Sequence, residues 1–228
     1  MSRETEIKRL LQSARAIDET MRRIGKGVAG HVVVGLGPLI ASATLSRAIP
    51  GLLLDYPDIT VQTLIDNASK LLPQVLNDKI EFAICGREML RPSPGVTIEP
   101  ICEMTVSVLA RADHPCRGQV VRVDEMCQWP VIGGSGNGSE EEDAVYRPTV
   151  LCDSFDILRR ITLASDSLWI TSAAAARDEL ASGALIAVEH EGRLRRTFEA
   201  VLIRRRGRTM LPAATILADR LIATLLAA

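Results

Sequence analysis

Strand-like and helix-like segments alternate along residues 31–85, and this alternation constrains the fold more than any other feature of the sequence. The strand-like runs are rich in β-branched and apolar residues and cover residues 31–34, 59–65 and 80–85. Between them, residues 38–55 and 67–78 have the apolar spacing of helices, with a break predicted at Pro50 and Gly51. Strands joined by helices at this spacing pair in parallel with right-handed crossovers, so the sequence predicts an α/β fold.

The second half of the sequence repeats the alternation. Residues 104–110 are predicted to form a strand at the junction between the halves. Further strands are expected at residues 131–132, 149–152, 168–170, 185–188 and 200–203. Helices are expected at residues 153–165, 172–182 and 209–227. Two α/β units joined near residues 103–110 predict a protein with two lobes and a cleft between them.

The N-terminal segment has a different periodicity from the rest of the chain. Its apolar residues follow a heptad spacing, and they are Ile7, Leu10, Ala14, Ile17, Met21 and Ile24. About two and a half heptads are too few to hold a coiled coil alone, so this stripe needs a partner. The partner is either the body of the same chain or the same helix of a second chain. Gly25, Gly27 and Gly30 are expected to end the helix and form a joint.

The charge and the aromatic content argue against nucleic-acid binding by this chain. Lys and Arg number 27 and Asp and Glu number 28, which gives a net charge of −1. A chain held to DNA through its phosphates normally carries a basic excess. Three Phe, two Tyr and two Trp also leave few rings on which bases or sugars could stack.

The cysteines and histidines form no recognisable metal set, and no cofactor is expected. The five cysteines are widely spaced and include no C-x-x-C pair, so they are interpreted as reduced thiols of a cytoplasmic protein. Residues 27–46 carry no charged side chain, but glycines and a proline at residues 35–38 would interrupt a helix there. The sequence therefore predicts neither a membrane span nor a targeting segment.

Five short motifs give the sequence a resemblance to a known family. In chain order they are VVG at residues 33–35, DYPDI at 55–59, LNDKIEFAI at 76–84, VLARADHP at 108–115 and LASGAL at 180–185. With the amphipathic C-terminal helix, their order and spacing resemble the effector-binding region of LysR-type transcriptional regulators from about residue 5 to the C-terminus. The resemblance implies two Rossmann-like lobes of the type 2 periplasmic-binding-protein-like fold, preceded by the end of a linker helix.

The resemblance also implies how the chain is divided and what it does. Residues 1–26 would be the linker and dimerisation helix, residues 31–106 with 208–228 the first lobe, and residues 107–207 the second lobe. Such a domain binds a small-molecule effector in the cleft between the lobes and forms a homodimer or homotetramer. Contact with DNA is expected only through an N-terminal winged helix-turn-helix, which this sequence lacks. No contact with a membrane is expected.

Turns at the carboxyl ends of the predicted parallel strands are the expected effector site, because helix N-termini at such turns offer free N–H groups. The candidate residues are Gly37, Pro38, Leu39, Asn67, Ala68, Ser69, Gly86 and Arg87, with Ser135 and Phe155 on the facing lobe. Arg87 is either a clamp for a carboxylate or phosphate or a solvated charge in a loop. Asn67 and Ser69 can also cap the helix that follows them.

Two of these positions depart from the pattern that the resemblance implies. Family members that bind carboxylated effectors often have a hydroxyl side chain at the first turn and another at the second, where this sequence has Leu39 and Ala68. Pro38 has no N–H group to donate. The sequence therefore predicts an effector that is less polar, or less dependent on hydroxyl groups, than a simple aromatic carboxylate.

Two other functions stay open at this point. A solute-binding protein of the same fold would feed a transporter, but the sequence lacks the signal peptide that such a protein needs. An enzyme on this fold would need a nucleophile paired with a base, and no His lies near a Cys or Ser in a recognisable motif. Asp113, His114 and Pro115 match the interlobe segment of the family and are assigned a structural role.

Overall fold

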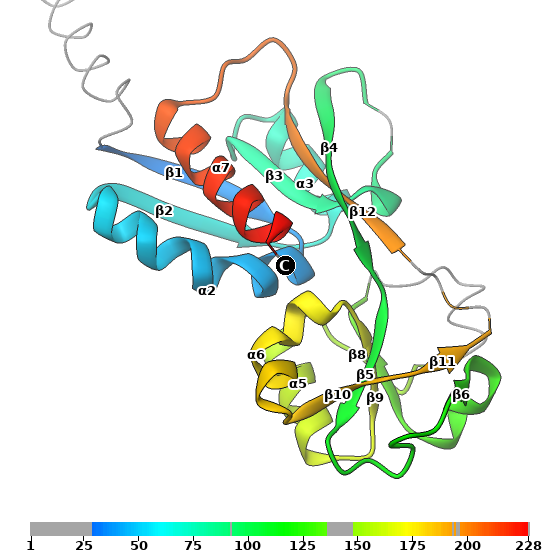
Figure 1. Cartoon of the computed structure of the whole chain (residues 1–228). Coiled ribbons are helices and arrows are strands. Elements are labelled where there is room, and N and C mark those ends of the chain that lie inside the picture. The colour runs from blue at the N-terminus through cyan, green and yellow to red at the C-terminus, as the bar shows by residue number, and fades with distance from the viewer. Residues whose placement is uncertain (1–28, 92, 136–147, 193, 195–196, 228) are drawn as a thin grey trace, which may run out of the picture.

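The computed structural model describes residues 29–91, 93–135, 148–192, 194 and 197–227. The predicted linker helix at residues 1–26, with its dimerisation stripe, lies outside the described residues. Within them the chain forms two lobes, one above the other in Figure 1, and it passes between the lobes twice. The predicted α/β fold with two lobes is confirmed.

The first lobe is a five-stranded sheet in the order β2-β1-β3-β12-β4. Its strands are β1 (Ala29–Leu36), β2 (Asp58–Ile65), β3 (Phe82–Gly86), β4 (Val96–Thr105) and β12 (Thr197–Arg205). Its helices are α2 (Pro38–Asp55), α3 (Ala68–Leu76), α7 (Pro212–Leu226) and the short 3₁₀ helix η1 (Arg87–Met89). β1 pairs in parallel with β2 and β3, as predicted, whereas β12 runs antiparallel between β3 and β4.

Helices cover both faces of this sheet. For this reason the sequence of β3 is a continuous apolar run. Phe82 and Ile84 point into the core shared with α2 and α7, which lie side by side in Figure 1. Ala83 and Cys85 point the other way, into a smaller core beneath α3. Successive side chains of a strand alternate between faces, so a strand covered on both sides needs apolar residues at every position.

The second lobe is a smaller mixed sheet in the order β10-β5-β9-β7-β8. Its strands are β5 (Ser107–Arg111), β7 (Val131–Gly133), β8 (Val150–Leu151), β9 (Leu168–Thr171) and β10 (Leu185–Val188). Its helices are α5 (Phe155–Ala164), α6 (Arg177–Ser182) and the 3₁₀ helices η2 (Val123–Gln128) and η3 (Ala173–Ala176). A separate ladder joins β6 (Val121–Arg122) to β11 (His190–Glu191).

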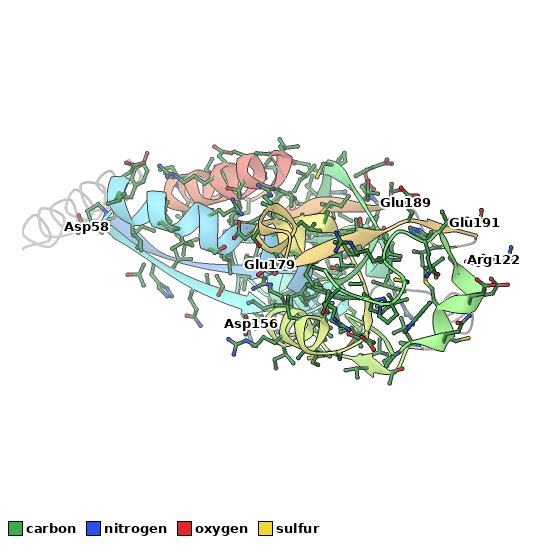
Figure 2. The ribbon with its side chains drawn as sticks, turned by 60° about the horizontal axis from the view of Figure 1, so that its bottom comes forward. Asp58, Arg122, Asp156, Glu179, Glu189 and Glu191 are labelled. Carbon is green, nitrogen blue, oxygen red and sulfur yellow. The ribbon has the colours of Figure 1, made fainter. Side chains whose placement is uncertain are left out.

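One arginine ties the two helices of the second lobe together. Asp156 on α5 and Glu179 on α6 are both labelled in Figure 2. Their carboxylate oxygens lie 3.6 Å and 3.3 Å from nitrogen atoms of Arg159, which also donates to the Ala175 carbonyl over 3.2 Å. Arg159 therefore fixes α5 against α6 and η3.

Among the described residues, no helix is both long enough and apolar enough to cross a membrane.

The two passages of the chain between the lobes lie side by side. On the way out, only Val106 separates β4 in the first sheet from β5 in the second. On the way back, β12 begins at Thr197, and Thr197 pairs with Thr105 at the end of β4. The lobes are thus joined by two adjacent strands, which form the hinge between them.

The structure corrects the predicted boundary of the second lobe. Residues 107–207 were expected in that lobe, but β12 belongs to the first sheet. The reason is that Ala200, Val201 and Ile203 are fully buried and Leu202 nearly so, with side chains on both faces of the strand. Such a strand needs a central position, and the position between β3 and β4 provides it.

Three local predictions were also wrong. The α2 helix runs through Pro50 without the predicted break, because Ala48 and Leu52 are buried in the core while Pro50 and Ser46 face solvent. The carbonyl that loses its partner at Pro50 is therefore exposed to water. The strand expected at residues 104–110 is divided between β4 and β5, and the helix expected at 172–182 is divided between η3 and α6.

Replacing Gly35 with alanine tests how tightly β1 packs on α3. A Cβ atom at Gly35 would lie 2.7 Å from Ile80 Cδ1 and 2.8 Å from Leu71 Cδ2, both in the core. We expect Gly35→Ala to lower the free energy of unfolding by about 1–3 kcal/mol, the usual cost of overpacking. Urea denaturation measures this change. Gly51→Ala is the control, because its new methyl group meets only the flexible end of Arg220. An equal loss in both variants would contradict the packing described here.

Candidate functional site

A cleft lies between the two lobes, at the carboxyl ends of the parallel strands of the first sheet. It encloses about 660 Å³, part of which is open to solvent. The cleft is lined by Gly37, Pro38, Leu39, Ile40, Asn67, Ala68, Cys85, Gly86, Glu88, Gly134, Asp153, Phe155 and Phe198. Seven of the predicted site residues line the cleft, and they are Gly37, Pro38, Leu39, Asn67, Ala68, Gly86 and Phe155. The other three, Ser69, Arg87 and Ser135, do not line it.

The first turn brings the backbone of α2 into the cleft. Gly37 is the N-cap of α2, and its N–H donates to the Ile84 carbonyl over 2.8 Å. A Cβ at Gly37 would lie only 3.3 Å from Cα and Cβ of Cys85, so glycine allows the turn to pack against β3. Pro38 has no N–H, and no side chain caps the helix. The N–H groups of Leu39 and Ile40 therefore have no partner within α2.

The second turn is closed by its own side chains. Asn67 is the N-cap of α3, and its Oδ1 accepts the N–H of Lys70 over 3.3 Å, which confirms that Asn67 caps this helix. The Ser69 hydroxyl donates to the same Oδ1 over 2.6 Å. Ser69 is therefore directed toward Asn67, while Ala68 leaves the adjacent part of the cleft without a polar side chain.

At the third turn, an acidic residue occupies the place expected for a basic one. Arg87 is held outside the cleft lining by an ion pair between its Nε and the carboxylate of Glu199 on β12. Glu88, the next residue, borders the cleft instead. Its Oε1 accepts the N–H of Glu199 over 3.1 Å. Glu199 thus binds Arg87 through its side chain and Glu88 through its backbone N–H.

The second lobe contributes an acid and an aromatic ring. The Oδ1 of Asp153 accepts the N–H of Ser135 over 2.9 Å, so Ser135 positions a lining residue without lining the cleft itself. Phe155, at the start of α5, packs edge-on against the buried Trp169, with ring centroids 5.8 Å apart. Phe155 therefore has a fixed position in the wall opposite Leu39.

Sequence reasoning missed Ile40, Cys85, Glu88, Asp153 and Phe198. Glu88 and Asp153 lie within two residues of predicted site residues, so a wider window around each turn would have included them. Phe198 carries no local signal, because it reaches the cleft only through the insertion of β12 into the first sheet.

The cleft wall contains a thiol that stays protonated. Cys85 is 1% exposed, and burial together with the nearby negative charge of Glu88 raises its pKa to about 12. A thiol of this pKa is a poor nucleophile and a poor metal ligand at neutral pH. Within the described part of the chain, no group of His, Cys, Asp and Glu side chains could hold a metal ion.

His114 was expected in a segment between the lobes, but it follows β5 within the second lobe and has only structural partners there. It is 2% exposed, and its Nδ1 accepts the N–H of Cys116 over 3.1 Å, which leaves Nε2 to donate to the Asp166 carbonyl over 3.2 Å. Its ring packs edge-on against Trp129. Arg111 pairs with Asp113 and Asp166 beside it, and its hydrogen bond to Asp113 lowers the pKa of that carboxyl. None of these residues lines the cleft.

The raised pKa of Cys85 predicts how stability depends on alkaline pH. In the unfolded chain this thiol has its ordinary pKa of 9.0, whereas in the folded chain its pKa is about 12. Between these values the unfolded state loses the proton first, so the free energy of unfolding contributed by Cys85 falls as pH rises above about 9. Cys85→Ala removes this contribution. We expect the stability difference between the two proteins, measured by urea denaturation, to shrink from pH 8 to pH 10.5. A constant difference would contradict the raised pKa.

Comparison with known proteins gives one family and one fold. The family description "LysR substrate binding domain" matches residues 25–225. The HTH-type transcriptional regulator YtlI of Bacillus subtilis (strain 168) is 27% identical over 110 residues, which are 46% of this chain and 34% of that protein. The matched region thus spans about a third of the length of that relative.

Solved structures share the fold at low sequence identity. Full-length OxyR from Pseudomonas aeruginosa superposes with a TM-score of 0.71 at 16% identity, over 95% of this chain and 77% of that one. CbnR, a LysR family transcriptional regulator, superposes with a TM-score of 0.65 at 14% identity, over 95% of this chain and 77% of its own. At these identities the likeness concerns the fold alone.

Proposed function

Since this chain belongs to the family of LysR substrate-binding domains, we propose that its interlobe cleft binds a small-molecule effector that controls a transcriptional regulator. The effector would favour one relative orientation of the lobes. That orientation would in turn alter how the DNA-binding module of the regulator engages its operator. The family consists of transcriptional regulators, and this supports the regulatory function over a transport or an enzymatic one.

The observation that carries the proposal is that the cleft wall comes from both lobes. Leu39 and Ile40 belong to the first lobe, and Gly134 and Phe155 belong to the second. A ligand that contacts both walls binds one orientation of the lobes better than another. Differential affinity of this kind is the only way in which a ligand can shift a conformational equilibrium.

The lobes meet through a partly exposed ion pair and through apolar contacts, since buried residues of both lobes, among them Ile40 and Leu158, belong to one core cluster. Arg47 on α2 forms an ion pair with Asp178 on α6, and the two side chains are 37% and 83% exposed. α2 also contacts α5 and η3. An ion pair with this exposure contributes only about 0.2–1 kcal/mol, so its loss adds little to the cost when a ligand shifts the orientation of the lobes.

We also propose that the chain acts in the cytoplasm as a homodimer or homotetramer. The heptad stripe from Ile7 to Met21 supports pairing between two subunits, because so short a stripe needs an apolar partner. The net charge of −1 supports DNA contact through a separate module of the regulator, because this domain carries no basic excess.

Substitution of Leu39 tests binding in the cleft. Ligands of the intact chain are first identified by a thermal-shift screen, in which a ligand at 100 times its dissociation constant adds about 2.7 kcal/mol to stability. We expect Leu39→Ala to weaken binding of such a ligand roughly tenfold, because it removes apolar contact area from the wall. Isothermal titration calorimetry measures the affinity. Leu54→Ala is the control, since Leu54 lies on the same helix but is 83% exposed. A ligand whose affinity is the same for both variants would not occupy this cleft.

Removing the Arg47–Asp178 ion pair tests the lobe equilibrium. We expect Arg47→Gln to reduce the population of the orientation in which α2 meets α6 by up to about fivefold, because the lost pair contributes at most about 1 kcal/mol. Small-angle X-ray scattering would then show a larger mean radius of gyration. Arg220→Gln is the matched control, because Arg220 pairs with Asp55 inside the first lobe. An identical radius in both variants would show that the interlobe pair does not restrain the lobes.

A further inference from the structure

Two polar groups on β9 are buried without a hydrogen-bond partner in the described part of the chain. They are the indole Nε1 of Trp169 and the hydroxyl Oγ1 of Thr171, named here the β9 pair. The two residues are 0% and 3% exposed. Folded proteins satisfy most of their buried polar groups, because an unpaired one costs free energy when it leaves water. The β9 pair therefore requires a partner that the folded chain does not supply.

Both side chains of the pair point to the face of the second sheet that α5 and η3 cover. Residues two apart on a strand share a face, and they are about 7 Å apart along it. Trp169 belongs to the same core as Leu158 on α5 and Ala175 on η3. Its neighbours Leu168 and Ile170 belong to a separate core on the opposite face.

The β9 pair adjoins the cleft at the end nearest the hinge. β7 and β9 run in parallel, with Gly133 opposite Ile170. The next residues along these strands are therefore level with each other, and they are Gly134, which lines the cleft, and Thr171. On its other side Thr171 pairs with Ser107, the first residue of β5 after the hinge. The hydroxyl of the pair thus lies between the cleft wall and the hinge.

Phe155 separates the indole of the pair from the cleft. Phe155 lines the cleft, and its ring packs edge-on against that of Trp169 with centroids 5.8 Å apart. Phe155 begins α5, and both α5 and η3 contact α2 of the first lobe. A rotation of the lobes about the hinge would change these contacts, and with them the cover over the β9 pair.

We propose that the β9 pair is a hydrogen-bonding subsite of the cleft, which binds an oxygen atom of the effector when the lobes rotate. The indole N–H can only donate, and the hydroxyl can donate as well as accept, so the matching group is an acceptor such as a carbonyl or hydroxyl oxygen. Phe155 and Phe198, which line the cleft, would contact the apolar part of the same ligand. An analogue without the oxygen would leave both groups unpaired and is therefore rejected. This inference rests on the proposed function, because it assigns a ligand contact in the same cleft.

Matched uncharged compounds test whether the pair recognises an oxygen. Each set places a ketone, a secondary alcohol and a methylene group at one position of the same aryl-alkyl skeleton. The sets are screened against the intact chain by thermal shift at millimolar concentration, and affinities are measured by calorimetry. We expect the ketone or the alcohol to bind about five- to a hundredfold more tightly than the methylene analogue, the effect of two neutral hydrogen bonds. Equal affinities within every set, or no binding by any ketone or alcohol, would overturn the inference.

Substitution of the hydroxyl tests the same contact from the side of the protein. Thr171→Val puts a methyl group in place of an unpaired hydroxyl, so we expect the melting temperature of the free chain to stay the same or rise. We expect this variant to weaken binding of the oxygen-bearing compound about two- to tenfold and to leave binding of its methylene analogue unchanged.

Thr162→Val is the matched control for this substitution. Thr162 is also buried in the second lobe, but its hydroxyl donates to the Leu158 carbonyl over 2.8 Å. We expect Thr162→Val to leave both affinities unchanged. A lower melting temperature for Thr171→Val, with no change in affinity, would show that the hydroxyl binds internal water only, and it would overturn the inference.

The fluorescence of Trp169 tests the indole of the pair. The chain has two tryptophans, so Trp129→Phe leaves the emission of Trp169 alone. We expect the oxygen-bearing compound to shift this emission to longer wavelength than its methylene analogue does, because a hydrogen bond to the indole N–H stabilises the excited state. The same emission with both compounds would show that the ligand does not reach the indole, and it would overturn the two-group subsite.

Two results distinguish failure of this inference from failure of the proposed function. A ligand whose affinity depends on Leu39 but not on Thr171 would overturn the subsite and leave the cleft as the effector site. Binding that is unaffected by both Leu39→Ala and Thr171→Val would place the ligand elsewhere, and it would count against both proposals.

Discussion

The return of the chain into the first sheet is the constraint on which the cleft depends. β12 is inserted between β3 and β4 and pairs with both along most of its length. It buries apolar side chains on both faces, so it needs a central position in a covered sheet. The same insertion places Phe198 in the cleft wall and Glu199 beside η1. Without it, the cleft would lose an aromatic wall and the residue that orients both Arg87 and Glu88.

Most of the first lobe could be predicted from the sequence, because its helices and turns are marked by residues within each segment. Gly37 and Pro38 mark the start of a helix, and Asn67 is a typical N-cap. The carboxyl ends of parallel strands meet at one edge, so these turns could be expected to share a cleft. The position of β12 was not predictable in this way, because it depends on pairing with strands about a hundred residues earlier in the chain.

Arg87 was predicted to line the cleft, but its neighbour Glu88 lines it instead. The sequence alone could not predict which of the two side chains borders the cleft. Adjacent residues of opposite charge follow β3, and either could point toward a ligand. The choice is made by Glu199, which lies 112 residues beyond Arg87 and pairs with it. The composition does not indicate this ion pair, because a net charge of −1 does not show which arginines form ion pairs outside the cleft. Cys85 is buried, and its surroundings keep the thiol protonated at neutral pH.

The short hinge has a consequence for how the domain could respond to different ligands. Because Val106 alone separates β4 from β5, and Thr197 is paired beside it, a change in the angle between the lobes would be centred on this point. The gap between the lobes then widens with distance from the hinge, and a longer or bulkier molecule would hold them at a larger angle. Related compounds with the same head group would set intermediate angles, which is a structural basis for partial agonism.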